Sequence, residues 1–370
     1  MDINTRELQR AIGKLKGLIN TKSPYNAIKG ILYADGVMCA TDMNVHARVK
    51  VDTGLIPTNE RFIIPIIAFD AINKLSASTT TLTLNRDTLN VSSGKFNADF
   101  VTPNADDFPT PDASGEAAMS VEVDFAQFIN ALDSVAFAVS ADEKKGVLCG
   151  VNMASGGAIM RMTGLDGFRA ATARLNLADI HTFSVTVPQG FWTVLAKISS
   201  GEKKVTFSVG ENNKSVSIKG EEFEVVTRTL EGNFADVQSI MDGIKPDKQI
   251  IVSKDDILHA LDLHGAALKD SGVNNLVVLY ADPDTASLVF SAKSASSNFS
   301  YEISAELIGL SEPFKIGFNS RYLMDAIKAM PDTDEVRLYC KSAVTGALVQ
   351  DMKDLNRYCA LVLPVRFNNV

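Results

Sequence analysis

Few side chains in this sequence lie at spacings that catalysis or metal binding requires. His259 and His264 are five residues apart on an expected helix, so they point apart instead of converging on a metal ion as an i, i+4 pair would. Asp106 and Asp107 are adjacent carboxylates at an expected turn, where aspartate is common. The chain contains no Gly-x-Gly-x-x-Gly and no Gly-Lys-Ser/Thr phosphate-binding motif. The sequence therefore predicts no catalytic residue, no metal site and no cofactor.

The elements that would position a site begin in the same way three times. Each start combines a helix-capping side chain, a Glu, Gln or Asp three residues later, and flanking apolar residues at the spacing of a hydrophobic staple. The caps are Asn4, Asp124 and Ser253, and the residues three positions later are Glu7, Gln127 and Asp256. The caps are separated by 120 and 129 residues. This self-similarity predicts one structural unit repeated three times.

A second helix is expected in each unit, beginning near Pro65, Pro188 and Asn319. Proline suits the first turn of a helix, where its missing N–H leaves no hydrogen bond unmade. A lysine follows nine residues after each of these positions: Lys74, Lys197 and Lys328. In the first two units, the lysine lies about 140° around the helix from an apolar face. That face consists of Phe69 and Ile72 in the first unit and of Trp192 and Leu195 in the second.

The remaining segments have the composition of strands. Runs such as residues 81–84, 205–209 and 276–280 are rich in β-branched and apolar residues and are bounded by Gly, Asn and Asp. Each unit therefore has the order helix, strands, helix, strands, which predicts an α+β fold of three tandem helix–sheet units. Turn-forming residues at 110–119 and 242–249 mark the joints. The expected units are residues 1–119, 120–246 and 247–370.

Composition restricts the class of protein further. Hydrophobic residues make up 46% of the 370-residue chain and charged residues 22%, which is typical of a well-packed globular protein. The formal net charge of −8 argues against binding nucleic acid over the whole surface, although it leaves room for a local basic face. The four cysteines form no Cys-x-x-Cys pair, so reduced thiols are expected. Apolar runs are too short to span a membrane, and we expect a cytoplasmic protein.

The first helix of the chain has two chemically different faces. Four residues form an apolar stripe: Leu8, Ile12, Leu15 and Ile19. Three cations follow at four-residue spacing on the far side: Arg6, Arg10 and Lys14. These cations and the lysines of the second helices suit sequence-independent contact with phosphates. The alternative is an ordinary solvated helix face, and the first helix of the second unit has no positive charge.

Four longer motifs resemble one known family. They are Gly-Leu-Asp-Gly-Phe-Arg at 164–169, Leu-Glu-Gly-Asn-Phe-Ala-Asp at 230–236, Phe-Asn-Ser-Arg-Tyr at 318–322 and Leu-Pro-Val-Arg-Phe at 363–367. In this order and spacing they resemble the bacterial DNA polymerase III beta subunits, the sliding clamps, over the length of the chain. The resemblance implies a head-to-tail homodimer that closes six units into a ring around duplex DNA, with helices inside and antiparallel sheets outside.

The resemblance also implies a peptide-binding pocket between the second and third units. Its partners would be the polymerase III catalytic subunit, the clamp loader, translesion polymerases, mismatch-repair proteins and ligase. Carried over by position, its residues are Leu148, Leu165, Gly167, Phe168, Arg169, Ala170, Ala235, Ile240, Val273, Asn319, Tyr322, Val344, Leu361, Val362, Leu363, Pro364, Val365 and Arg366. An apolar cleft with a few polar anchors suits recognition of an extended peptide. For each apolar member, the alternative is ordinary core packing.

Some positions depart from the family pattern. Phe168 stands where His is common, Leu165 where Thr is common, Ala235 where Pro is frequent and Ser239 where Arg is frequent. We therefore expect a more apolar pocket and a shifted partner preference. For DNA, the resemblance implies contacts from loop residues Lys22 and Lys145.

Two other functions remain open from sequence. A repeat-built protein-interaction scaffold that never encircles DNA would share the fold but would have no use for basic residues on unpacked helix faces. A nucleic-acid enzyme would require a metal-binding carboxylate cluster, which the sequence does not suggest.

Overall fold

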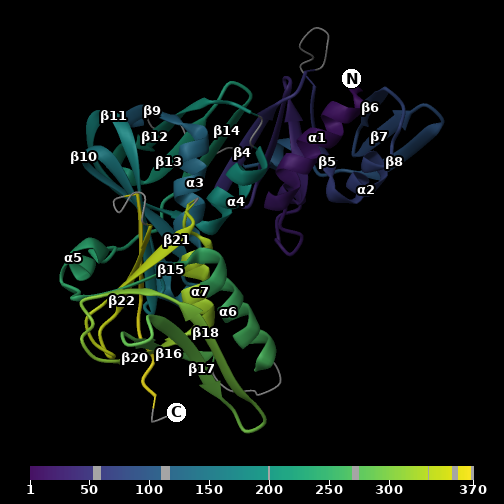
Figure 1. Cartoon of the computed structure of the whole chain (residues 1–370). Coiled ribbons are helices and arrows are strands. Elements are labelled where there is room, and N and C mark those ends of the chain that lie inside the picture. The colour runs from purple at the N-terminus through teal and green to yellow at the C-terminus, as the bar shows by residue number, and fades with distance from the viewer. Residues whose placement is uncertain are drawn as a thin grey trace. The chain divides into compact units, whose positions relative to one another are not determined.

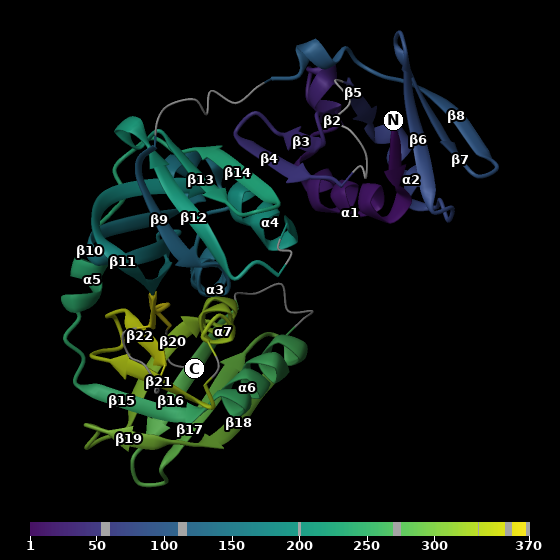
Figure 2. The same cartoon turned by 90° about the horizontal axis from the view of Figure 1, so that it is seen from above.

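The computed structural model describes residues 1–52, 60–109, 117–198, 201–268, 275–331, 333–351 and 357–367 (Figures 1 and 2). The chain divides into two compact units, which are described separately below. The first unit contains residues 1–129 and 177–229, and the second contains residues 130–176 and 230–370. Two elements, helix α3 and strand β11, run from one unit into the other.

One order of elements occurs three times along the chain. The first copy contains β1 (Asp2–Asn4), α1 (Thr5–Leu15), β2 (Gly30–Ala34), β3 (Val37–Thr41), β4 (Val45–Lys50), β5 (Arg61–Pro65), α2 (Phe69–Asn73), β6 (Thr79–Asn85), β7 (Thr88–Ser93) and β8 (Phe96–Val101). The second contains β9 (Ala117–Asp124), α3 (Phe125–Ala136), β10 (Gly150–Leu165), β11 (Arg169–Pro188), α4 (Gln189–Ile198), β12 (Lys204–Gly210), β13 (Ser215–Lys219) and β14 (Phe223–Arg228). The short helix α5 (Val237–Asp242) follows.

The third copy closes the chain. It contains β15 (Lys248–Ser253), α6 (Lys254–Ala267), β16 (Leu276–Asp282), β17 (Ser287–Lys293), β18 (Asn298–Ser304), β19 (Glu306–Ile308), β20 (Phe314–Asn319), α7 (Ser320–Lys328), β21 (Glu335–Cys340), β22 (Ala347–Asp351) and β23 (Tyr358–Val362). In the second copy, the long strands β10 and β11 replace four shorter ones. The mixture of helices and antiparallel strands confirms the α+β fold class.

The three predicted helix starts are confirmed at the level of hydrogen bonds. The Asn4 side chain accepts from the amide of Glu7, that of Asp124 from Gln127, and that of Ser253 from Asp256. The first helical N–H donates in each case to the residue just before a strand, β6, β12 or β21: Thr5 N to Ser78 O, Phe125 N to Lys203 O and Lys254 N to Asp334 O. Local sequence therefore sets each helix start, and a repeated tertiary contact anchors it.

The second helices begin after the prolines: α4 starts one residue after Pro188, and a 3-10 turn at Ile66–Ala68 separates Pro65 from α2. Pro65 and Pro188 are the last residues of β5 and β11, and helical geometry starts after them. Pro65 has extended backbone angles because it pairs with Gly30 in the sheet. The apolar faces are as predicted, since Phe69, Ile72, Trp192 and Leu195 are all buried.

Each compact unit contains two sheets. In the first unit, β5-β2-β3-β4-β14-β13-β12-β9 form one sheet and β1-β6-β7-β8 the other. In the second unit, the orders are β10-β11-β23-β22-β21-β15-β19 and β18-β17-β16-β20. Two antiparallel pairings join successive copies of the repeat. We call β4·β14 the first junction, with Ala47 opposite Val225, and β11·β23 the second junction, with Ala171 opposite Ala360.

Candidate functional site

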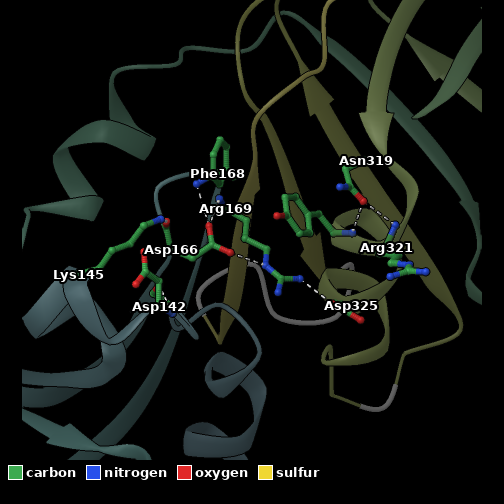
Figure 3. Close-up of polar contacts among 10 residues, drawn as sticks. Asp142, Lys145, Asp166, Phe168, Arg169, Asn319, Arg321 and Asp325 are labelled. Carbon is green, nitrogen blue, oxygen red and sulfur yellow. Dashed lines mark hydrogen bonds and ion pairs between the residues drawn. The ribbon is translucent and has the colours of Figure 1, made fainter. Parts of the chain in front are cut away.

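A tight turn between β10 and β11 presents an aromatic side chain to solvent. The Asp166 carboxylate accepts hydrogen bonds from the amides of Phe168, at 2.8 Å, and Arg169, at 2.9 Å. Gly167 has a φ of +95°, which favours glycine over residues with a side chain. The turn leaves Phe168 56% exposed. Figure 3 shows Phe168 beside Asp166 and Arg169.

The Arg169 side chain ties this turn to helix α7. Its Nε lies 3.0 Å from a carboxylate oxygen of Asp166, and one terminal nitrogen lies 2.6 Å from a carboxylate oxygen of Asp325. The guanidinium carbon is also 4.4 Å from the centre of the Tyr322 ring, at cation–π distance. Only 12% of the Arg169 side chain is exposed. Arg169 is therefore bound mainly to neighbouring residues of the protein (Figure 3).

Helix α7 places Tyr322 against the turn. Asn319 caps the helix by accepting hydrogen bonds from the amides of Arg321, at 3.0 Å, and Tyr322, at 3.4 Å. The Tyr322 and Phe168 rings are stacked, with centroids 6.3 Å apart and an interplanar angle of 30°. Two elements far apart in sequence thus build one aromatic pair.

Lys145 also contacts the turn and the Phe168 ring. Its ammonium group donates to the Asp166 carbonyl oxygen at 2.7 Å and lies 5.4 Å from the centre of the Phe168 ring. Lys145 was expected to face DNA, but its ammonium belongs to the same contact network as Phe168 (Figure 3).

The C-terminal segment runs beside the turn. The Leu363 amide donates to the Phe168 carbonyl at 3.0 Å, and the Val365 amide donates to the Gly317 carbonyl at 2.8 Å. A side chain at Gly317 would bring Cβ within 2.8 Å of the Val365 carbonyl oxygen, so this close approach requires glycine. The segment is therefore held by the turn before β11 and by β20.

An apolar cluster lies beneath helix α5 and the strands of the second junction. Its buried members are Ala170, Val237, Met241, Ile244, Leu348 and Leu361, with Leu165 and Phe234 packed against them. Three further apolar side chains of the predicted set are exposed: Ile240, Val344 and Leu363. Burying such residues under an apolar partner would be favourable.

The predicted peptide-site residues fall into three groups. Exposed members are Gly167, Phe168, Ala235, Ile240, Val344, Leu363 and Arg366, and partly buried ones are Leu148, Leu165, Arg169, Asn319, Tyr322, Pro364 and Val365. Ala170, Leu361 and Val362 are buried in the sheet. Val273 lies outside the described residues. Sequence reasoning missed Asp325, although it follows Tyr322 by three residues and so shares its face of α7.

The predicted DNA-facing residues are exposed with two exceptions. Arg6, Arg10, Lys22, Lys74, Lys197 and Lys328 are exposed. Lys145 is half-buried, and Lys14, expected on the open face of α1, is only 8% exposed. Burial, followed by the nearby Arg10 charge, lowers the pKa of the Lys14 ammonium. Helix α1 packs against α4 as well as against its own sheet, so a single stripe does not describe its buried surface.

A hollow of about 630 Å³ lies at the first junction, and its lining residues are not among those predicted for the peptide site. Val37, Arg48, Lys50 and residues 219–224 line it. Its three cations are matched by three glutamates, and Arg48 lies 3.4 Å from Glu224. The lining therefore favours no single charge type of ligand.

The described residues contain neither a candidate metal site nor a candidate membrane-spanning helix. No group of three or more His, Cys, Asp or Glu side chains there could hold a metal ion. In the same part of the chain, no helix is long and apolar enough to cross a membrane.

Comparison with known proteins gives a consistent result. Residues 122–236 match the family model of the DNA polymerase III beta subunit central domain, and residues 244–366 match that of its C-terminal domain. The beta sliding clamp of Rickettsia bellii is 25% identical over 98% of both chains. That of Bacillus subtilis is 26% identical over 80% of this chain and 78% of its own.

Solved structures show the same fold. The DNA polymerase III beta subunit of Thermotoga maritima has a TM-score of 0.89 at 23% identity, and the B. subtilis sliding clamp has a TM-score of 0.89 at 22% identity. Each comparison covers 99% of both chains. The threefold order of elements, the four motifs and the two matched domains agree, and the chain belongs to the DNA polymerase III beta subunit family, the beta sliding clamps.

Proposed function

We propose that this sliding clamp works as a head-to-tail homodimer whose ring encircles duplex DNA in the cytoplasm, at the nucleoid. It would act without catalysis, as a processivity factor that tethers partner proteins by topology. The ring proposal rests on the sheet junction that occurs twice in the chain. The strands that would form a third such junction are edge strands, with no partner on one side in the described sheets.

The unused edges belong to β8 and β18. In the first junction, the last strand of one copy of the repeat (β14) pairs with a strand of the preceding copy (β4). The second junction repeats this with β23 and β11. The equivalent strands of a third junction are β8 and β18, which are edge strands in the described sheets. Pairing β8 of one chain with β18 of another would satisfy both edges.

The repeat also predicts the register of that pairing. Ala98 lies opposite Val91, as Val225 lies opposite Ile218, and is thus equivalent to Val225. Asn298 lies opposite Lys293 as His46 lies opposite Thr41, which makes Phe299 equivalent to Ala47.

Because Ala47 faces Val225 in the first junction, Ala98 of one chain should face Phe299 of the other. Phe96 should then face Tyr301, two residues along each strand. This register would place apolar side chains of both strands on the inner face of a continuous sheet.

The DNA-facing set would line the ring. Arg6, Arg10, Lys22, Lys74, Lys197 and Lys328 are exposed cations on helices, helix ends and the loop after α1. Such side chains contact phosphates without reading sequence, and a closed ring needs only weak contacts. This explains how a chain with a net charge of −8 could hold DNA. Lys14 and Lys145 are weaker candidates because of their burial and bonding.

The aromatic pair, the apolar cluster and the C-terminal segment would form the peptide site. Its ligands would be short segments of the polymerase III catalytic subunit, the clamp loader and repair proteins. We also propose the repeat boundaries 1–119, 120–246 and 247–370, which the matches at 122–236 and 244–366 support.

Retention on circular DNA tests this function. The clamp would be loaded on a nicked circular plasmid, and gel filtration would then measure its release before and after linearisation. We expect release only after linearisation, because a ring slides off free ends. Light scattering should give a mass of roughly 80 kDa, twice the 39.9 kDa of one chain. A monomer at all concentrations, or equal release from both DNA forms, would contradict the ring.

A further inference from the structure

The two junctions share a turn of the same construction. At the first junction, the Asp42 carboxylate accepts from the amides of Asn44, at 2.9 Å, and Val45, at 2.7 Å, as Asp166 does from Phe168 and Arg169. The Arg228 amide donates to the Asn44 carbonyl at 3.1 Å, as that of Leu363 does to Phe168. Val45 therefore occupies the position of Arg169.

The helices that contact the two turns, α4 and α7, are also equivalent. Helix α4 begins after Pro188 as α7 begins after Asn319, so Val194 occupies the position of Asp325. A Cβ built on Gly190, at the start of α4, would lie 3.1 Å from Val45 and 3.2 Å from Asp42. Helix α4 thus meets the first turn as α7 meets the second.

An ion pair at the second junction therefore replaces two valines at the first. Val45 and Val194 are both buried. The side chains of Arg169 and Asp325 are 12% and 43% exposed, so their ion pair is partly solvated and its replacement by apolar residues should cost little stability. The first junction shows that the turn forms without an arginine. The role of the Arg169–Asp325 pair should therefore lie in a feature that is present at the second junction and absent from the first.

Among the described residues, the first junction has no equivalent of the stacked pair formed by the exposed Phe168 and the partly buried Tyr322. Its equivalents of Phe168 and Tyr322 are the polar Asn44 and the fully buried Phe191. At the second junction, the Arg169 guanidinium lies against the Tyr322 ring, and its partner Asp166 holds the Phe168 amide. One arginine thus connects both halves of the aromatic pair, and Asp325 fixes that arginine.

We propose that Asp325 is a positioning residue for peptide binding. Through Arg169, it holds Phe168 and Tyr322 in the arrangement that a partner peptide meets, so that less conformational freedom is lost on binding. The inference rests on the proposed peptide-binding function of this surface. Asp325 need not touch the peptide.

A double variant that copies the first junction tests the proposal. Arg169→Val with Asp325→Val should fold and keep the melting temperature, but should weaken peptide binding by roughly tenfold or more. Asp325→Asn should weaken binding in the same direction, and Asp325→Glu should restore part of it. The matched control is Glu122→Gln, which removes the exposed ion pair with Lys204 in the first unit and should leave binding unchanged.

The probes would be fluorescein-labelled synthetic peptides that tile the polymerase III catalytic subunit of the same genome, read by fluorescence anisotropy. If the valine double variant binds as the wild type does, the positioning role is wrong. A lowered melting temperature with unchanged affinity would show a merely structural role and would also overturn it. If no peptide binds the wild-type clamp, the proposed function fails instead.

Amide hydrogen exchange then provides an independent reading. The Phe168 and Arg169 amides, which Asp166 holds, should exchange faster in Asp325→Asn than in the wild type. Unchanged exchange at these two amides would overturn the proposal whatever the peptide result. If the double variant fails to fold, peptide affinity and amide exchange of the single Asp325→Asn variant test the proposal instead.

Discussion

The outer faces of the two junctions have the same backbone pairing but differ in polarity. His46 and Val226 are opposite each other in the first junction, where Ala170 and Leu361 are opposite in the second. Beside them, Arg228 in the first junction corresponds to Leu363 in the second. Because Val226 is apolar and buried, the polar character of the first junction comes from His46 and Arg228, whose equivalents in the second junction, Ala170 and Leu363, are apolar.

This difference explains why one chain should have one peptide site although it repeats its unit three times. The repeat provides the backbone of each junction, and under the proposed function a few outward-facing side chains would decide whether that junction binds an apolar peptide. The proposed third junction follows the polar pattern, because Asp99 and Asn298 would occupy its outer face. Binding therefore depends on side chains that the sheet itself does not require.

The largest expected effect concerns the third junction. Ala98→Arg should leave each chain folded but raise the dimer dissociation constant by roughly a thousandfold, because an unpaired charge would be buried against Phe299 of the partner. Sedimentation velocity would measure this as conversion to single chains. Asn97→Arg, on the opposite face of β8, is the control. A dimer of normal strength in Ala98→Arg would show that the junction rule does not extend between chains.

The second prediction converts one junction into the other. Phe168→Asn with Leu363→Arg gives the second junction the side chains of the first, Asn44 and Arg228. We expect peptide affinity to fall by at least roughly a hundredfold, because two apolar anchors are removed, while the backbone hydrogen bond between these positions is kept. Isothermal titration calorimetry would measure it.

The reciprocal change, Asn44→Phe with Arg228→Leu, serves as its control and should leave that affinity unchanged. If the converted second junction still binds peptide tightly, the exposed aromatic and aliphatic side chains are not what distinguishes the two surfaces.

The third prediction concerns the helices behind the junctions. Charge reversal of Lys74, Lys197 and Lys328 to glutamate should shorten DNA synthesis per binding event in a primer-extension assay by severalfold. The salt dependence of DNA association should also weaken, with a slope smaller by about 0.9 for each phosphate that the variant no longer neutralises. Reversal of Lys95, Lys219 and Lys293, which are exposed on strands or turns, provides a charge-matched control. Equal processivity in the two triple variants would remove these lysines from the DNA-facing set.

The smallest expected effect is a pH dependence at the edge of the third junction. His264 is 2% exposed, and its ring packs edge-on against Phe299 of β18. Burial lowers the pKa of His264, although a hydrogen bond to the Leu276 carbonyl opposes this. The neutral ring is thus favoured in the folded state, so its contribution to stability is complete above the unfolded pKa of about 6.5 and is lost as the pH falls toward the folded pKa.

Melting temperatures between pH 7.5 and 5.5 would measure this contribution. His264→Phe should show a smaller loss of melting temperature on acidification than the wild type. Equal losses in the two proteins would show that other groups cause the acid sensitivity.

Sequence alone determined the features that depend on near neighbours in the chain. The caps at Asn4, Asp124 and Ser253 and the apolar faces of the helices follow from spacings of three or four residues, so local rules found them. The family motifs likewise identified the turn at residues 164–169 and the start of α7, because each is contiguous. These were enough to predict the α+β repeat and to nominate the residues of the proposed peptide site.

Only the tertiary structure decided the features that depend on contacts between distant segments. Lys14 fits an exposed stripe by spacing but is buried, because α1 packs against α4 as well as its own sheet. Lys145 looked like a free loop cation but is bonded to Asp166. Asp325 lacked a motif of its own and gained its place through Arg169, 156 residues away. Helix periodicity defines faces within a segment, whereas the pairing of strands between repeats decides which faces meet.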